Sequence, residues 1–82
     1  MYHTTLMVRA FIMAKTAAGK SEELLESVGG LEGVTEAHIV AGNYDLVVEA
    51  TAEEVYDLMH GVSTGVRNLD GIADTRTYIC LE

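Results

Sequence analysis

Two polar segments of the chain carry residue types suited to binding a small molecule: Gly42-Asn43-Tyr44-Asp45 and Thr75-Arg76-Thr77. A free amino acid is a zwitterion, so its site needs N–H donors for the carboxylate and oxygen acceptors for the ammonium group. A glycine-containing turn exposes backbone N–H donors, while the Asp45 carboxylate and backbone carbonyls can act as acceptors. The two segments therefore form a candidate amino-acid site.

A purely structural role for the same residues is the alternative. In that case Asp45 bonds only to its own turn, as aspartate often does, and Tyr44 only packs against its neighbours. The chemistry of the residues leaves both interpretations open.

One other segment looks like the end of a phosphate-binding P-loop, namely Gly19-Lys20-Ser21. That motif requires a glycine five positions before Gly19, and the residue there is Ala14. The loop then lacks the backbone freedom to wrap a triphosphate. We interpret the segment as an ordinary connection between a strand and a helix.

The remaining reactive side chains do not form a catalytic or metal-binding pattern. His3, His38 and His60 fall on different elements, without cysteine or aspartate at ligand spacing. Cys80 is the only cysteine, so it cannot form an internal disulfide. We expect its side chain to be buried and to act as a small hydrophobic group. No serine has an adjacent base. We therefore expect no metal, no cofactor and no enzymatic activity.

Length and charge restrict the possible partners. A chain of 82 residues has room for one domain, which we place at residues 7–82, behind a short N-terminal arm at residues 1–6. Five basic and thirteen acidic residues give a net charge of −8, and the basic ones are scattered. Direct binding to nucleic acid is disfavoured, because it needs clustered lysine and arginine. The acidity is also compatible with a high-salt cytoplasm.

The chain contains no apolar run of the roughly 20 residues that a membrane span needs, and its N-terminus does not resemble a signal peptide. We expect a cytoplasmic protein that does not contact membranes.

Hydrophobic periodicity predicts four strands and two helices. Leu24, Leu25, Val28 and Leu31 share one helical face, and Gly29-Gly30 ends that helix. The acids Glu22, Glu23, Glu26, Glu53, Glu54 and Asp57 are expected on solvated faces. The strands are expected at 7–15, 34–41, 46–50 and 71–81, with 34–41 and 46–50 joined in a hairpin through the Gly42–Asp45 turn.

The second helix is predicted to begin at Thr51, because Glu54 follows at the spacing of a capping box. Its buried face should carry a stripe of apolar side chains. These are Val55, Leu58, Met59, Val62, Val66 and Leu69.

The chain resembles itself at an offset of 38 residues, because Leu31-Glu32-Gly33-Val34 matches Leu69-Asp70-Gly71-Ile72. In each half a helix is followed by the same turn and then by a strand. Together the halves predict an α+β, ferredoxin-like βαββαβ fold: an antiparallel four-stranded sheet with two helices on one face.

The uncovered face of such a sheet would usually be polar. In the first strand, however, Met7, Phe11 and Met13 alternate with Val8 and Ile12, so both faces are apolar. We expect the uncovered face to pack against the sheet of a second subunit.

Several of these residues resemble a known family. The run Gly42-Asn43-Tyr44-Asp45-Leu46 resembles the Gly-x-Tyr-Asp signature of the Lrp/AsnC ligand-binding (RAM) domain, and Leu69-Asp70-Gly71-Ile72 with Thr75-x-Thr77 resembles its closing strand. The similarity extends over almost all of residues 7–82.

The resemblance implies a ferredoxin-like domain that dimerises through its sheet, assembles into rings such as octamers and binds amino acids between dimers. The ligand-binding residues that it implies are Gly42, Asn43, Tyr44, Asp45, Thr75 and Thr77. Full-length regulators of this family carry an N-terminal helix-turn-helix domain, which the six residues before Met7 cannot contain. We therefore expect a stand-alone effector-sensing module.

Two other functions stay open at this stage. The chain could be an interaction partner that co-assembles with full-length Lrp/AsnC regulators, or a small ferredoxin-like dimeric enzyme. The ACT domain shares the βαββαβ order and amino-acid binding, and topology alone does not separate it from the RAM domain.

Overall fold

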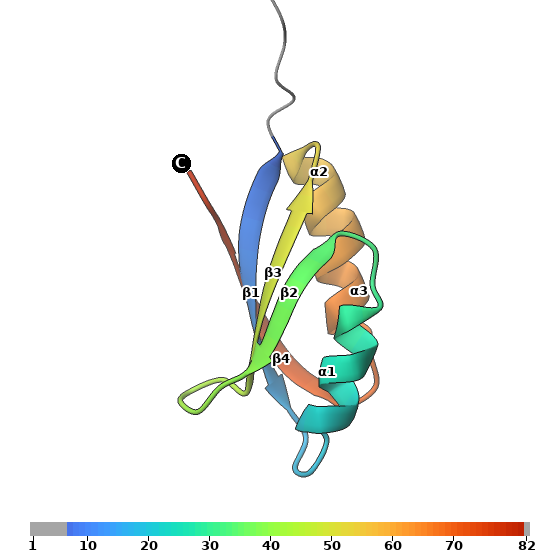
Figure 1. Ribbon diagram of the computed structural model, residues 1–82, viewed down its shortest axis with the longest axis vertical. Coiled ribbons are helices and arrows are strands. Elements are labelled where there is room, and N and C mark those ends of the chain that lie inside the picture. Colours follow the sequence, from blue (N-terminus) through green and yellow to red (C-terminus); the bar gives the residue numbers. More distant parts are fainter. Residues whose placement is uncertain (1–6, 82) are drawn as a thin grey trace, which may run out of the picture.

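The computed structural model describes residues 7–81, which fold into an antiparallel sheet with two helical regions on one of its faces (Figure 1). The sheet has four strands in the order β2-β3-β1-β4. The elements are β1 (Val8–Thr16), α1 (Ser21–Gly29), β2 (Val34–Ile39), β3 (Leu46–Ala52), α2 (Val55–Asp57), η1 (Leu58–Ser63), α3 (Thr64–Arg67) and β4 (Ile72–Ile79). The predicted βαββαβ order and the β2–β3 hairpin are confirmed. The proposed N-terminal arm at residues 1–6, with His3, lies outside the described residues.

Strand β1 lies inside the sheet and pairs with β3 on one side and β4 on the other. Alternation along β1 sends Ala10, Ile12 and Ala14 toward the helices, where all three are fully buried. Phe11 and Met13 lie between them on the opposite face and are half-buried. We call this face, which no helix of the described residues covers, the open face.

The core lies between the sheet and the helices. From α1, Leu24 and Val28 point into it at the predicted helical spacing. Strand β3 contributes Leu46, Val48 and Ala50, all fully buried. The core also takes Leu58, Val62 and Val66 from the second helical segment, which is α2, η1 and α3 taken together.

The predicted start of the second helix is wrong. Thr51 belongs to β3, where it pairs with Arg9 of β1 and donates its backbone N–H to the carbonyl of Gly33 over 2.8 Å. The helix begins at Val55, and Glu54 before it makes no side-chain capping bond. Strand pairing therefore overrides the local capping pattern.

The predicted apolar face of this helix is only partly right. Val55 and Met59 remain 48% and 39% exposed. The six-residue η1 is a π-helix, and the hydroxyl of Thr64, the first residue of α3, donates to the Met59 carbonyl over 3.1 Å. The wider turns of η1 break the α-helical period on which the prediction depended. Met59 consequently points away from the core, and Val55, at the start of α2, is also exposed.

The internal repeat is visible as two matching turns. Gly33 and Gly71 both have positive φ angles, 95° and 102°. In each turn the strand begins with an N–H bonded to the carbonyl of the repeated leucine, Val34 to Leu31 and Ile72 to Leu69, both over 3.2 Å. Glycine is required because other residues adopt such φ angles only with strain.

Candidate functional site

The candidate site begins at the turn between β2 and β3, which projects from the sheet on the side away from the helices (Figure 1). The turn is closed by the N–H of Val40, which donates to the Asp45 carbonyl over 2.9 Å. The Asp45 N–H in turn donates to the Ala14 carbonyl of β1, also over 2.9 Å. The turn is therefore fixed to the end of β1 as well as to its own hairpin.

The Asp45 side chain strengthens this attachment. Its Oδ2 accepts the backbone N–H of Thr16 over 2.8 Å and faces the Thr16 hydroxyl at 3.4 Å. That hydroxyl also shares a hydrogen bond of 2.8 Å with the hydroxyl of Ser21, the first residue of α1. One carboxylate oxygen therefore links the turn to β1 and, through Thr16, to the start of α1.

The top of the turn has free hydrogen-bond donors. Within residues 7–81, the backbone N–H groups of Gly42, Asn43 and Tyr44 have no protein acceptor. Gly42 and Asn43 are exposed, and Tyr44 is half-buried. Consecutive unpaired N–H groups on a turn can bind an anion such as a carboxylate.

A cation that the sequence analysis did not single out lies beside the turn. The Lys15 Nζ atom is 5.7 Å from the centroid of the Tyr44 ring, in a cation–π arrangement. The alternation that sends Phe11 and Met13 to the open face sends Lys15 there too. From the sequence, the strand alternation could therefore have predicted that Lys15 lies on the face from which the turn projects. It could not have predicted that Lys15 lies next to Tyr44.

The two threonines of β4 lie on the helix side of the sheet. Thr75 is opposite Ala14 in the register, so it reaches the same end of the sheet as Asp45. Thr77 is opposite Ile12 and shares a hydrogen bond of 2.9 Å with the hydroxyl of Ser63, which is buried in η1. The structure brings the four turn residues together at the end of β1. It places Thr75 at the same end of the sheet but on β4, across β1 from the turn, and Thr77 deeper, under the second helical segment.

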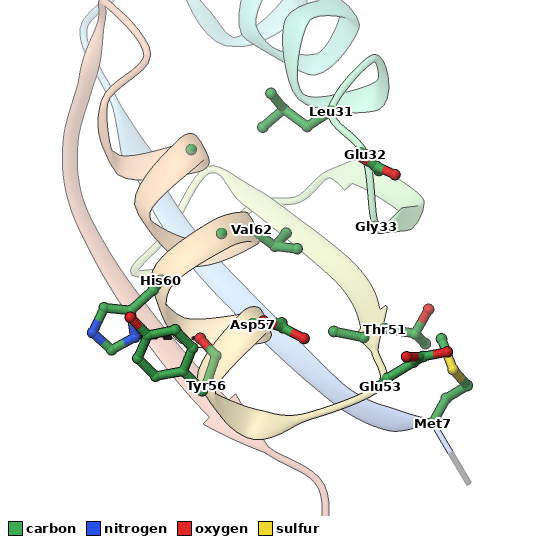
Figure 2. Close-up of a pocket in the computed structure, with 13 residues that line it drawn as sticks. Met7, Leu31, Glu32, Gly33, Thr51, Glu53, Tyr56, Asp57, His60 and Val62 are labelled. Carbon is green, nitrogen blue, oxygen red and sulfur yellow. Dashed lines mark hydrogen bonds between the residues drawn. The ribbon is translucent and has the colours of Figure 1, made fainter. Parts of the chain in front are cut away.

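A groove of about 840 Å³ lies elsewhere, between the turn before β2 and the second helical segment (Figure 2). Val62 points across it toward Gly33, and the stacked rings of Tyr56 and His60, whose centroids are 4.2 Å apart, also belong to its lining. Carboxylates line the groove, and its described lining holds no lysine or arginine. Its carboxylates could accept from an ammonium group, but the side-chain donors of the described lining that could meet a carboxylate are Thr51, Tyr56 and His60.

The other reactive groups remain dispersed. Within residues 7–81 no cluster of histidine, cysteine and carboxylate side chains could hold a metal ion. His38 bonds to Glu36 over 3.0 Å on an exposed surface. Cys80 is half-buried, not fully buried as expected. No helix among the described residues is long and apolar enough to cross a membrane.

The predicted solvated acids are all exposed. In α1 these are Glu22, Glu23 and Glu26. Glu53 and Glu54 are exposed in the connection before α2, and Asp57 is exposed within α2.

Known proteins of similar sequence and structure agree with this architecture. The Leucine-responsive regulatory protein of Haemophilus influenzae is 30% identical over 61 residues, and the match covers 74% of this chain but 37% of the relative. The structure of FFRP-DM1 superposes with a TM-score of 0.84 at 36% identity, over 90% of this chain and 99% of that one.

A Neisseria meningitidis transcriptional regulator, solved as a complex with L-Met, shares the fold with a TM-score of 0.80 at 19% identity. All of this chain and 59% of that regulator are covered. The family model for the Lrp/AsnC ligand binding domain matches residues 9–82. The chain therefore belongs to the Lrp/AsnC ligand-binding domain family.

Proposed function

We propose that the protein binds a free amino acid at the Gly42–Asp45 turn and acts as an oligomerising effector-sensing module. The observation that carries the proposal is the set of unpaired N–H groups at Gly42, Asn43 and Tyr44 beside a carboxylate, in a chain of the ligand-binding family. These donors suit the ligand's α-carboxylate.

The ammonium group of the ligand requires acceptors in the same place. Asp45 uses Oδ2 for Thr16, and its Oδ1 makes no hydrogen bond within residues 7–81. That oxygen can therefore accept from an ammonium group, a charge-assisted bond worth about 1.5–3 kcal/mol. Of the two β4 threonines, Thr75 lies at the same end of the sheet as the turn and is the better placed for an additional contact with the ligand. Thr77 would contribute from deeper in the fold, under the second helical segment.

The open face supports assembly. It carries the large side chains of Phe11, Met13, Val47 and Tyr78, and Tyr78 is 56% exposed in the single chain. Covering these side chains with a second sheet would contribute on the order of 25 cal/mol per Å² of apolar area removed from water. We propose a dimer formed through this face, with higher assemblies that bring turns from different dimers together.

Co-assembly with full-length regulators is the second candidate. It is favoured by the match to 37% of the length of the Haemophilus influenzae regulator. A domain with the same fold can offer the same open face to such a protein, so mixed assemblies would change how many DNA-binding domains each assembly carries.

A thermal-shift screen of the twenty amino acids tests the proposed function. L-Leucine and L-methionine come first, because a relative is named for leucine and a protein of the same fold was solved with L-Met. An amino acid at a hundred times its dissociation constant should stabilise the fold by about 2.7 kcal/mol. If none of the twenty changes the melting temperature, the sensing function is refuted and co-assembly becomes the leading candidate.

A further inference from the structure

The position of Lys15 is fixed relative to the turn. Its two chain neighbours both bond to Asp45: Ala14 accepts the Asp45 N–H over 2.9 Å, and Thr16 donates its N–H to the carboxylate over 2.8 Å. Lys15 lies between them, and its side chain emerges on the opposite face of the strand, against the Tyr44 ring. The backbone from which this ammonium group extends is therefore held next to the turn.

The Lys15 ammonium group is also available. Within residues 7–81 it forms no ion pair, although Asp74 lies opposite it in β4. Lys20, the other lysine near this end of β1, pairs with Glu23 over 3.8 Å. Lys15 is thus the lysine that can serve a ligand at the turn.

Charge determines what such a ligand should be. The chain has a net charge of −8, so an approaching carboxylate meets general repulsion unless a cation lies nearby. Lys15 provides that cation from β1, and Asp45 provides one negative charge on the turn that bonds to the two chain neighbours of Lys15. One positive and one negative group match a zwitterion.

We propose that Lys15 binds the α-carboxylate of the ligand and makes the site prefer amino acids that have a free α-carboxylate. This role rests on the proposed function and adds to it the charge class of the ligand. The unpaired N–H groups of Gly42 and Asn43 would share the same carboxylate.

The test compares acids with their amides by calorimetry on the intact protein. The probes are L-methionine with L-methioninamide and L-leucine with L-leucinamide. The wild type should bind the acid about five to ten times more tightly than the amide. In Lys15→Gln the affinity for the acid should fall to the affinity for the amide, whereas the affinity for the amide should not fall. Lys15→Arg should restore the preference, because it retains the charge.

Lys20→Gln is the matched control, because it removes one partly exposed positive charge near the same end of β1 and should preserve the wild-type preference. Equal preference for the acid in the wild type and Lys15→Gln overturns the role of Lys15 and leaves amino-acid sensing intact. A loss of both acid and amide in Lys15→Gln also overturns it, because the effect is then structural. Absence of any stabilisation in the twenty-amino-acid screen refutes the sensing function and this role together.

Discussion

The Oδ2 atom of Asp45 accepts the backbone N–H of Thr16 over 2.8 Å, although 29 residues separate the two in the sequence. This bond connects the proposed ligand-binding turn to the end of a central strand. It also gives Asp45 two separable roles, one in holding the turn and one in receiving the ligand.

We expect Asp45→Ala to lower the free energy of unfolding by about 1–3 kcal/mol, because the Thr16 N–H loses a charged acceptor. The same variant should weaken amino-acid binding roughly ten- to a hundredfold through the loss of the ammonium acceptor. Urea denaturation and calorimetry measure the two effects separately.

Asp45→Asn distinguishes the roles, because its amide oxygen can still accept from Thr16 but carries no charge. Stability should largely return while ligand affinity stays low. Asp57→Ala, on an exposed helix position, is the control and should change neither quantity. Wild-type affinity in Asp45→Ala would remove Asp45 from the site.

Phe11→Asp should dissociate the oligomer, because it would place an unpaired carboxylate in the middle of the open face. Phe11 lies opposite Glu49 on one side and Tyr78 on the other, and only half of it is covered within one chain. Sedimentation velocity at micromolar concentration measures the change, with circular dichroism to check the fold.

Val55→Asp is the matched control for Phe11→Asp. Val55 is also a partly exposed apolar residue, but it lies at the start of α2 and not on the open face. Its variant should sediment like the wild type. An unchanged oligomer in a folded Phe11→Asp would place the interface elsewhere.

Gly33→Ala should destabilise the fold by about 2–4 kcal/mol, from left-handed backbone strain and overpacking together. Its φ is 95°, and a Cβ there would lie 2.6 Å from Cγ2 of Val62. Gly29→Ala, where a Cβ would meet nothing within 4 Å, should instead be neutral or stabilising by up to about 1 kcal/mol. Chemical denaturation of the two variants decides the matter, and equal stabilities would refute a special role for the turn.

The purified protein should not bind duplex DNA at moderate salt. Its five basic residues are divided among β1, the loop after it, α3 and β4, and the net charge is −8. Three of them, Arg9, Lys15 and Arg76, share the open face with the acids Glu49 and Asp74, and Arg9 pairs with Glu49 over 3.7 Å. A fluorescence anisotropy titration with random-sequence duplex checks this. Saturable binding that weakens steeply with salt would contradict the expectation.

Much of the fold could be predicted because it depends on local patterns. The alternation in β1 correctly placed Ile12 on the opposite face from Phe11 and Met13, and the spacing of Leu24 and Val28 correctly indicated the helix face that enters the core. The repeated glycines at 33 and 71 correctly indicated two equivalent turns.

The errors occurred where tertiary contacts decide the outcome. Thr51 resembles a helix cap in the sequence, but its N–H donates to the carbonyl of Gly33, 18 positions earlier in the chain. The strand therefore continues past Thr51. The π-helical turns of η1 could not be recognised from a periodicity that assumes an α-helix. Lys15 lies beside Tyr44 only because the turn bonds to Ala14 and Thr16.

The two repeated turns have a consequence for how the domain holds together. Gly33, in the first half of the chain, lies against Val62 and Thr51 of the second half, while Gly71, in the second half, lies against Leu24 of the first and accepts the N–H of Ala17. Each half thus supplies the residues against which the turn of the other half packs. The two copies of the repeat therefore depend on each other. If the chain is severed at the Gly42–Asp45 turn, neither copy is expected to fold on its own.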